Sequence, residues 1–236
     1  MKSILVFTLM TTTFLNSSCQ DVTENKLTET EIKAGWKLLF DGKTMNGWRT
    51  FKNKSGNSWE AINGEMHCKG SATDKSDLRA DLITIEQYAN FELSIDWKIA
   101  KAGNSGIMYH VTEEFNAAYL TGPEYQLIDD EGFPEKLEDW QKTGTDYAMY
   151  NTISRPVKPA GEYNNSKIIF NKGHVEHWLN GVKVLEFEAW SEDWNKRKAS
   201  GKWKDVKGYG MSKTGFICLQ DHGSEIWFKN IKIKPL

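Results

Sequence analysis

The chain has little cysteine, little proline and almost no net charge, and each shortage excludes a class of protein. Three cysteines in 236 residues cannot build the disulfide framework of a small secreted scaffold. A formal net charge of −2 offers no basic surface for nucleic acid or for an anionic membrane. Five prolines and the lack of an internal repeat exclude collagenous and solenoid architectures.

Several catalytic signatures are missing as well. The sequence has no Gly-rich phosphate loop, no Gly-x-Ser-x-Gly elbow, no His-Glu-x-x-His zinc motif and no EF-hand loop. It also lacks the Glu-x-Asp-x-Glu strand pattern of laminarinase-type sandwich glycosidases, which argues against the usual two-carboxylate mechanism. Aromatic residues are abundant instead, with ten Trp. Most are expected to pack in strands, while exposed rings could stack on sugars.

The longest apolar stretch lies at the N-terminus. Lys2 precedes the run ILVFTLMTTTFL, which is too short to span a bilayer, and small residues follow it, as in a secretory signal. Cys19 comes next and resembles the lipidated residue of a bacterial lipoprotein. We therefore expect residues 1–18 to be a signal peptide and Cys19 to anchor the protein in the cell envelope, in the periplasm or at the outer membrane. Plain secretion is the alternative.

The mature chain divides into a short polar segment and one globular domain. Residues 19–34 contain few large apolar side chains, so we expect a tether whose last part forms a helical turn. The domain then covers residues 35–236. Cys68 and Cys218 lie inside it without the spacing of a metal site. Two buried thiols are favoured over a disulfide between them.

Short strands dominate the domain. Residues 91–99 alternate strictly between apolar and polar side chains, which predicts a strand with one buried face. Asn63-Gly64 and Asn180-Gly181 are typical of tight hairpin turns. Further strands are expected at 106–111, at 123–129, three within 167–188 and two within 214–236. This pattern predicts an all-β fold, a β-sandwich with loops over one face.

Two long segments interrupt the strands. Residues 129–166 and 189–213 show little periodicity, but their aromatic residues argue against disorder. Ser191, followed by Glu192 and Asp193, predicts the start of a helix. These segments are therefore expected to cover one face of the sandwich.

A polar strand face marks a candidate site. Glu124 and Gln126 share one face of their strand, where a closed core would require apolar side chains. Alternation also places Met108 and His110 on one face of the preceding strand. Two such strands side by side would give a polar concave face, which predicts a sugar-sized site. His177 alternates with apolar residues and is expected to be a buried, hydrogen-bonded histidine.

The stretch Gln220–Gly223 (QDHG) admits two interpretations. It joins two apolar runs, as a hairpin turn would, and spacing alone favours this turn. It could also place the carboxylate of Asp221 and the imidazole of His222 at the mouth of a site.

Six motifs in order resemble one known family. They are FDGKTMNGW, GNSGIMYH, GPEYQLIDD, PAGEYNNSKIIF, HVEHWLNG and TGFICLQDHG…WFKNIKI. Together they resemble the 3-keto-disaccharide hydrolase domain family of bacterial envelope proteins, over about residues 35–236. The resemblance implies a concanavalin A-like jelly-roll sandwich that cleaves glycosides oxidised to a ketone at C3. An upstream sugar dehydrogenase would make the ketone, so no nucleotide cofactor is expected.

The resemblance also implies a particular chemistry. A ketone at C3 acidifies the hydrogen on C2, so a general base can remove it; the C1 substituent then leaves by β-elimination and water adds back. His110 and Glu124 are the base and acid that we expect, with Gln126 as a donor to the enolate oxygen. A divalent cation held by Glu124, Asp129 and His110 is the alternative electrophile.

The remaining expected site residues come from the same motifs. His222 is a further catalytic candidate, and Asp221 could hold its imidazole. The expected substrate-binding residues are Asn104, Gln126, Trp140, Glu162, Asn164, Gln220 and Asp221.

Two other functions stay open at this point. One is a conventional glycoside hydrolase acting on unoxidised glycans, and the other is a non-catalytic carbohydrate-binding module of the same fold. A binding module needs aromatic platforms and hydrogen-bonding groups but no proton-transfer residues. The presence of His110 and Glu124 therefore favours an enzyme.

Overall fold

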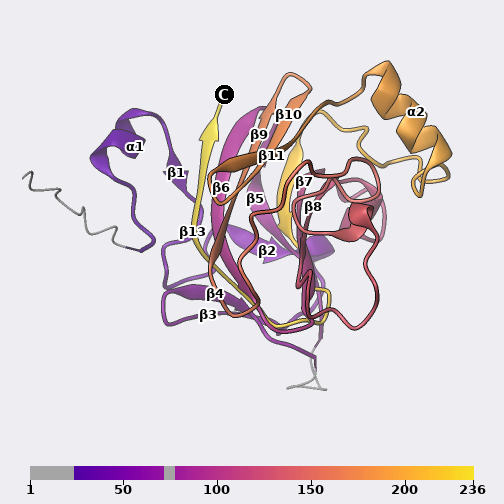
Figure 1. Cartoon of the computed structure of the whole chain (residues 1–236). Helices are drawn as coiled ribbons and strands as arrows, with labels where there is room; N and C mark the ends of the chain where they lie inside the picture. Colours follow the sequence, from indigo (N-terminus) through magenta and orange to yellow (C-terminus); the bar gives the residue numbers. More distant parts are fainter. Residues whose placement is uncertain (1–23, 72–77) are drawn as a thin grey trace, which may run out of the picture.

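Two antiparallel sheets packed face to face form the core of the molecule, as the computed structural model shows for residues 24–71 and 78–236 (Figure 1). The larger sheet has the order β11-β10-β9-β6-β13-β4-β3, with β1 paired to β13. Its strands are β1 (Lys37–Leu38), β3 (Trp59–Ile62), β4 (Glu65–Cys68), β6 (Phe91–Ile99), β9 (Asn164–Asn171), β10 (His174–Leu179), β11 (Val182–Glu188) and β13 (Ile226–Pro235). The expected signal peptide, residues 1–18, and Cys19 lie outside the described residues.

The smaller sheet carries the functional face. Its order is β2-β5-β12-β7-β8, and its strands are β2 (Trp48–Thr50), β5 (Leu82–Tyr88), β7 (Asn104–Val111), β8 (Glu124–Ile128) and β12 (Gly215–Leu219). Short helices accompany the sheets: α1 (Glu29–Lys33), η1 (Phe51–Asn53), η2 (Ala118–Leu120), η3 (Asp139–Gln141) and α2 (Glu192–Ser200). The all-β jelly-roll sandwich predicted from the sequence is confirmed.

Apolar faces of both sheets meet in the core. In β6, Phe91, Leu93 and Trp97 are at most 1% exposed, as the strict alternation predicts. The Trp97 indole donates to Ser166 Oγ at 2.8 Å, so its polar atom is satisfied inside the core. His177 is also buried, with Nδ1 2.9 Å from the Gly144 carbonyl oxygen, which confirms its predicted structural role.

Parts of the two long segments lie over the outer face of the smaller sheet, while the Ile153 amide of the first segment donates to the Val184 carbonyl of β11 in the larger sheet at 2.9 Å. Ser191 caps α2 by accepting from the Trp194 amide, which confirms the predicted helix start. A second apolar cluster on this face includes Ile83, Met108 and Cys218. Cys218 and Cys68 are both buried free thiols, as expected. No helix in the described part of the chain is both long and apolar enough to cross a bilayer.

Residues 24–34 pack against the domain, whereas the sequence predicts a tether. Asn25 and Asn230 form a reciprocal pair: the Asn25 amide donates to Asn230 Oδ1 at 2.7 Å, and the Asn230 amide donates to Asn25 Oδ1 at 2.9 Å. Asn25 Nδ2 also donates to the Gly64 carbonyl. α1 lies on the side of the molecule opposite α2 (Figure 1). Hydrogen bonds between polar groups hold this segment on the domain. The pattern of apolar residues in the sequence therefore does not reveal that the segment is docked.

This pair makes a prediction about stability. Asn25→Ala should lower the free energy of unfolding by about 1–3 kcal/mol, because it leaves a partly buried amide and carbonyl without their protein partners. Urea unfolding monitored by tryptophan fluorescence measures the change, and the exposed Asn46→Ala is the matched control. An Asn25→Ala protein as stable as the control would show that the segment is not held by this pair.

Candidate active site

A cavity of about 480 Å³ opens on the outer face of the smaller sheet. Its size falls within the range of small-molecule sites, about 300–1,000 Å³. The residues that line it are Asp81, Asn104, Tyr119, Glu124, Gln126, Tyr147, Lys202, Trp203, Gln220, Asp221 and His222. The structure thus brings together six residues singled out from the sequence: Asn104, Glu124, Gln126, Gln220, Asp221 and His222.

Strand register explains this convergence. Glu124 pairs with Met108, which pairs with Cys218, so one row across the sheet ends in a carboxyl group beside apolar side chains. In the next row Gln126 pairs with Gly106, and the Gly106 carbonyl accepts from the Gln220 amide at 2.9 Å. Both rows therefore contribute polar side chains to the cavity: Glu124 from the first, and Gln126 and Gln220 from the second.

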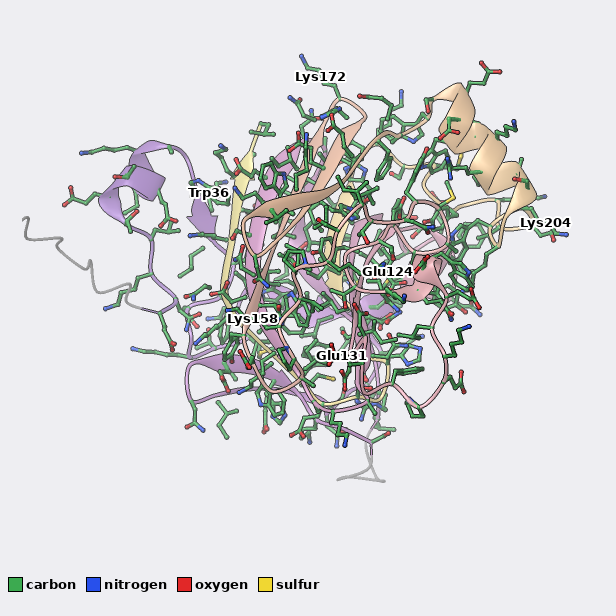
Figure 2. All side chains as sticks on the ribbon, viewed as in Figure 1. Trp36, Glu124, Glu131, Lys158, Lys172 and Lys204 are labelled. Atoms are coloured by element: carbon green, nitrogen blue, oxygen red, sulfur yellow. The ribbon has the colours of Figure 1, made fainter. Side chains whose placement is uncertain are left out.

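Gly106 makes room for the carboxyl group of Glu124. A Cβ atom at Gly106 would lie 2.0 Å from Glu124 Oε1 and 2.7 Å from its Cδ. The side chain of Glu124 therefore crosses directly above the strand β7 backbone. Glu124 lies on the side of the sandwich that the long segments cover (Figure 2).

Glu124 is a buried acid that has no hydrogen-bond partner among residues 24–71 and 78–236. Its side chain is almost inaccessible, and no described residue donates a hydrogen bond to its carboxyl group. Burial raises its pKa to about 8, with smaller upward contributions from the charges of Asp81 and Asp146, while Lys202 lowers it. Near neutral pH this carboxyl group is mostly protonated, as a general acid needs to be.

Asp81 is a second carboxyl group in the cavity, and sequence reasoning missed it. It directly precedes β5, and its Oδ1 accepts from the Asp221 backbone amide at 2.9 Å. Burial raises its pKa to about 6, and the nearby charge of Asp221 adds to this, while that backbone hydrogen bond and Lys54 lower it. A single Asp before an apolar run matches no known catalytic motif. The one signal in the sequence that could have marked Asp81 is its position directly before a strand.

The QDHG stretch contributes a site wall as well as a turn. The Asp221 side chain is buried, and its Oδ1 accepts from Arg79 Nε at 2.8 Å and from the Gly223 amide at 3.1 Å. The sequence allows a hydrogen bond between Asp221 and the imidazole of His222, but in the structure the Asp221 carboxylate forms an ion pair with Arg79. His222 is exposed at the cavity rim.

Two acceptor atoms beside the cavity have no partner within the described residues. They are Gln220 Oε1 and Asp221 Oδ2, both buried. An unsatisfied buried acceptor is costly, by about 1–3 kcal/mol, so natural proteins keep such groups where a ligand or water can reach them. Their position indicates a site for a molecule with several hydroxyl groups.

Aromatic rings form one wall. Tyr147 and Trp203 line the cavity, and the Trp203 indole donates to the Tyr147 carbonyl at 3.1 Å. Tyr209 stacks on Trp203 with 4.1 Å between ring centroids. The Lys202 ammonium lies 4.3 Å from the centre of the Tyr147 ring, which keeps a cation at the cavity mouth. Trp140 supports this wall from behind, edge-on to Tyr147, and does not line the cavity.

The structure places His110 away from the cavity. His110 has a φ of 53°, and the pairing of β7 with β12 shifts register at this point, so alternation fails there. Its ring packs against Phe170 with centroids 4.3 Å apart, and Nε2 lies 2.9 Å from the Ala89 carbonyl oxygen. Burial lowers its pKa to about 4. The prediction that His110 shares a face with Met108 is wrong.

Three other predicted residues also lie elsewhere. The Asp129 carboxylate accepts from the Ala102 and Gly132 amides, at 2.8 and 3.0 Å. Asn164 Oδ1 accepts from the Lys158 amide at 2.8 Å, and Glu162 is exposed in a turn. The structure therefore does not bring Glu124, Asp129 and His110 together as a cation site.

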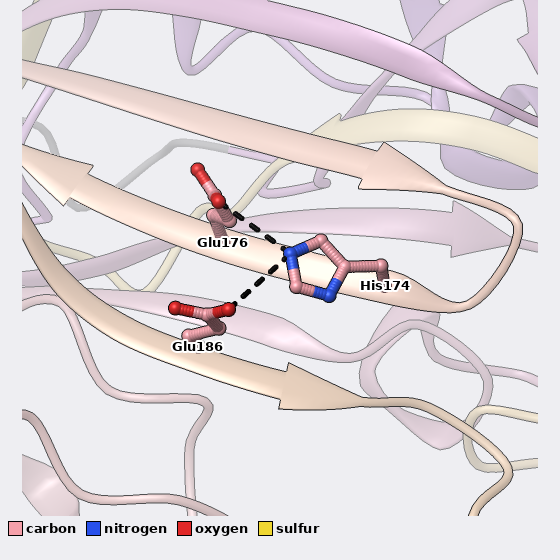
Figure 3. A group of neighbouring side chains, drawn as sticks. All are labelled: His174, Glu176 and Glu186. Carbon is pink, nitrogen blue, oxygen red and sulfur yellow. Dashed lines mark hydrogen bonds and ion pairs between the residues drawn. The ribbon is translucent and has the colours of Figure 1, made fainter.

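The described residues do contain one group with the spacing of metal ligands, on the opposite sheet. His174, Glu176 and Glu186 present ligand atoms within 4.8 Å of one another (Figure 3). Lys183 already pairs with both glutamates, so its ammonium occupies the place that a cation would take. This group is separate from the cavity.

The fold and the cavity together indicate a class of protein. A jelly-roll sandwich whose cavity combines carboxyl groups, amides and an aromatic wall is suited to binding a polar small molecule such as a sugar. The chain belongs to the 3-keto-alpha-glucoside-1,2-lyase-like domain family, whose model matches residues 35–234. The family resemblance drawn from the six motifs is confirmed.

Individual relatives agree with this assignment. A 3-keto-disaccharide hydrolase of Bacteroides thetaiotaomicron is 34% identical over 228 residues, which cover 86% of this chain and 79% of that protein. A crystal structure of a candidate glycosyl hydrolase from Parabacteroides distasonis is 46% identical, with a TM-score of 0.84, covering 91% of this chain and all of that one. A second such structure from P. distasonis is 27% identical, with a TM-score of 0.61 and coverage of 81% and 100%. These comparisons support a glycoside-cleaving enzyme.

Proposed function

We propose that this protein cleaves 3-keto-glycosides by elimination at C1 and C2 followed by hydration. The observation that carries the proposal is Glu124, a buried and mostly protonated carboxyl group that faces a polar cavity and accepts no hydrogen bond from the described residues. A proton donor of this kind serves an alkoxide leaving group. A binding module has no use for it, so the geometry favours an enzyme over a carbohydrate-binding module.

The amides of the cavity floor support the enolate. Gln126 Nε2 donates to the Gln141 carbonyl at 3.2 Å and to Asn104 Oδ1 at 3.4 Å, so its own donors are already engaged. This arrangement orients the Asn104 amide with Nδ2 left to donate. We therefore assign the contact with the C3 oxygen to Asn104, and Gln126 becomes the residue that positions it. The Lys202 ammonium adds positive potential at the same cavity.

A paired assay tests this function directly. One disaccharide is offered twice, untouched and pre-oxidised at C3, to purified protein with and without a chelator. Release of monosaccharide from the keto form alone is the expected result, and the chelator arm tests whether a divalent cation takes part. Cleavage of neither form would sink the proposal.

A second candidate is conventional hydrolysis of an unoxidised glycan. Asp81 and Glu124 share one cavity, and two carboxyl groups flanking the scissile bond are what that mechanism requires. The same paired assay separates the two, because a conventional hydrolase cleaves the untouched disaccharide.

The pKa of Glu124 makes a prediction about pH. The protonated form is the active one, so kcat/KM for a 3-keto-disaccharide should fall as pH rises, with a midpoint of about 8. The charged groups that act on Glu124 are Lys202, Asp81 and Asp146, so Lys202→Met should move this midpoint upward. A pH–rate profile of both proteins measures the effect. A profile that stays flat through this range would remove Glu124 as the acid.

The proposal also covers where the protein is located and which enzyme supplies its substrate. We propose that the protein is an envelope lipoprotein anchored at Cys19, and that a sugar dehydrogenase supplies its keto substrate. Fractionation of cells that express the full chain and a Cys19→Ala variant tests the anchor. The wild type should sediment with membranes, and the variant should be released.

A further inference from the structure

We infer that Asp81 is the catalytic base that removes the C2 proton, and that Asp221 and Arg79 are positioning residues for it. This inference rests on the proposed function and adds the group that the elimination still lacks. Glu124 supplies a proton at one side of the cavity, but abstraction at C2 needs a separate acceptor. The cavity-lining groups that could accept a proton include Asp81 and His222.

The geometry of Asp81 suits a base. Its Oδ1 is held by the Asp221 amide at 2.9 Å. Its other oxygen accepts no hydrogen bond from any residue in the described ranges, so one oxygen is fixed and the other is left to react. Asp81 sits at the start of β5, next to the row of Gln220 and Gly106 over which the Glu124 carboxyl lies. The two carboxyl groups therefore border the same part of the cavity floor.

The histidines fit the role less well. His110 is sealed in the core against Phe170 and does not line the cavity. His222 does line it, but its ring is exposed at the rim and none of the hydrogen bonds among the described residues orients it. A base must be held within hydrogen-bond reach of the proton that it takes. Of Asp81 and His222, Asp81 is the one held in place by a hydrogen bond from a described residue.

The two carboxyl groups differ in protonation near neutral pH. Burial raises the pKa of Asp81 to about 6 and that of Glu124 to about 8, so between these values the first is mostly ionised and the second mostly protonated. Charges facing Asp81 are Asp221, which raises its pKa, and Lys54, which lowers it. When the surroundings of two carboxyl groups separate their pKa values in this way, the group with the lower pKa can act as the base and the group with the higher pKa as the acid.

The reaction then balances without a further reagent. Asp81 takes the C2 proton, and the electron pair of that bond forms the enolate of the C3 ketone. The enolate expels the C1 substituent as Glu124 protonates its oxygen, leaving a C1–C2 double bond conjugated to the ketone. Water adds at C1 and gives its proton to Glu124. The proton on Asp81 exchanges with solvent while the intermediate is bound, and Asp81 then returns a solvent-derived proton to C2. Both carboxyl groups return to their starting states.

Arg79 and Asp221 hold the base from behind. The Arg79 guanidinium binds the Asp221 carboxylate, and this fixes the backbone whose amide donates to Asp81. The pair lies partly buried, with no exposure of the Asp221 side chain. Arg79→Lys should retain the charge but lose the paired hydrogen bonds that Nε and Nη2 donate to Asp221 Oδ1. We expect a lower kcat and an acid limb of the pH profile displaced from about 6, with KM little changed.

Exchange of the C2 hydrogen in heavy water isolates the base from the acid. Methyl 3-keto-glucoside is incubated with each protein, and NMR follows both loss of the C2 proton signal and release of methanol. Asp81→Asn should lose exchange and cleavage together, each by about 10²–10⁴-fold. Glu124→Gln should lose cleavage but keep exchange within several-fold. The exposed Glu86→Gln on the same strand is the matched control and should behave as the wild type.

The outcomes separate the two proposals. If the wild type exchanges and Asp81→Asn exchanges equally fast, Asp81 is not the base; loss of exchange in His222→Ala at the same time would transfer the role to His222. If the wild type neither exchanges nor cleaves, the proposed function itself fails and the role of Asp81 with it. Thermal unfolding of every variant shows whether a lost activity reflects a lost fold, and Asp81→Glu, which keeps the carboxylate, should recover part of the exchange.

Discussion

Glu124→Gln should reduce cleavage of a 3-keto-disaccharide by about 10²–10⁴-fold, the usual contribution of a positioned general acid. The substitution keeps the shape of the side chain and removes the transferable proton. A sugar alkoxide is a poor leaving group and depends on that proton. A nitrophenolate leaves without it, so the same variant should cleave a nitrophenyl 3-keto-glycoside at a rate close to that of the wild type.

The ratio of the two rates is the measurement. A large loss on the disaccharide with little loss on the nitrophenyl glycoside identifies Glu124 as the acid. An equal loss on both substrates would show that Glu124 acts before the leaving group departs, as a base or in binding. Isothermal titration with unoxidised disaccharide serves as the control, because a variant that has lost only the proton should bind as the wild type does.

Gly106→Ala should have the second largest effect, although it changes no polar group. The added Cβ would lie 2.0 Å from Glu124 Oε1, so the carboxyl group must move away. A displacement of about 1 Å at a reacting group can cost about 10²-fold in rate. We expect kcat for the 3-keto-disaccharide to fall by about that factor, and crowding in a packed site should cost about 1–3 kcal/mol of stability.

A glycine outside the cavity gives the comparison. At Gly56 a Cβ would meet the Thr50 methyl group at 3.2 Å and the Leu78 carbonyl at 3.3 Å, which small shifts can relieve. Gly56→Ala should therefore keep its activity. A Gly106→Ala protein with wild-type kcat would contradict the placement of the Glu124 carboxyl group above this residue.

Much of the fold could be predicted because its signals are local. Strict alternation over Phe91–Ile99 marks β6 to the residue, and the Asn-Gly turns mark their hairpins. β5 is different: its first residues are buried and the next three are exposed, so no period of two appears. The docking of Asn25 onto Asn230 joins residues 205 positions apart through polar atoms alone, and no local pattern reveals such a pair.

The site was only partly predictable for a similar reason. Glu124 and Gln126 could be found because polar side chains on a core strand break an expected pattern. The predicted placement of His110 in the site was wrong because a register shift between β7 and β12 turns its ring into the core. A single sequence does not show where such shifts occur. Asp81 is close to Glu124 only through the order β5-β12-β7-β8, which pairs segments far apart in the chain.

The most direct test of elimination followed by hydration is the isotope content of the first product. Wild-type protein is given a 3-keto-disaccharide in heavy water, and the released keto sugar is analysed by mass spectrometry and NMR at early times. Our account predicts one deuterium at C2 in the product of the first turnovers, beyond the exchange of the substrate without enzyme. Product that keeps its original hydrogen at C2 would contradict the mechanism, in which Asp81 exchanges its proton with solvent before it returns one to C2.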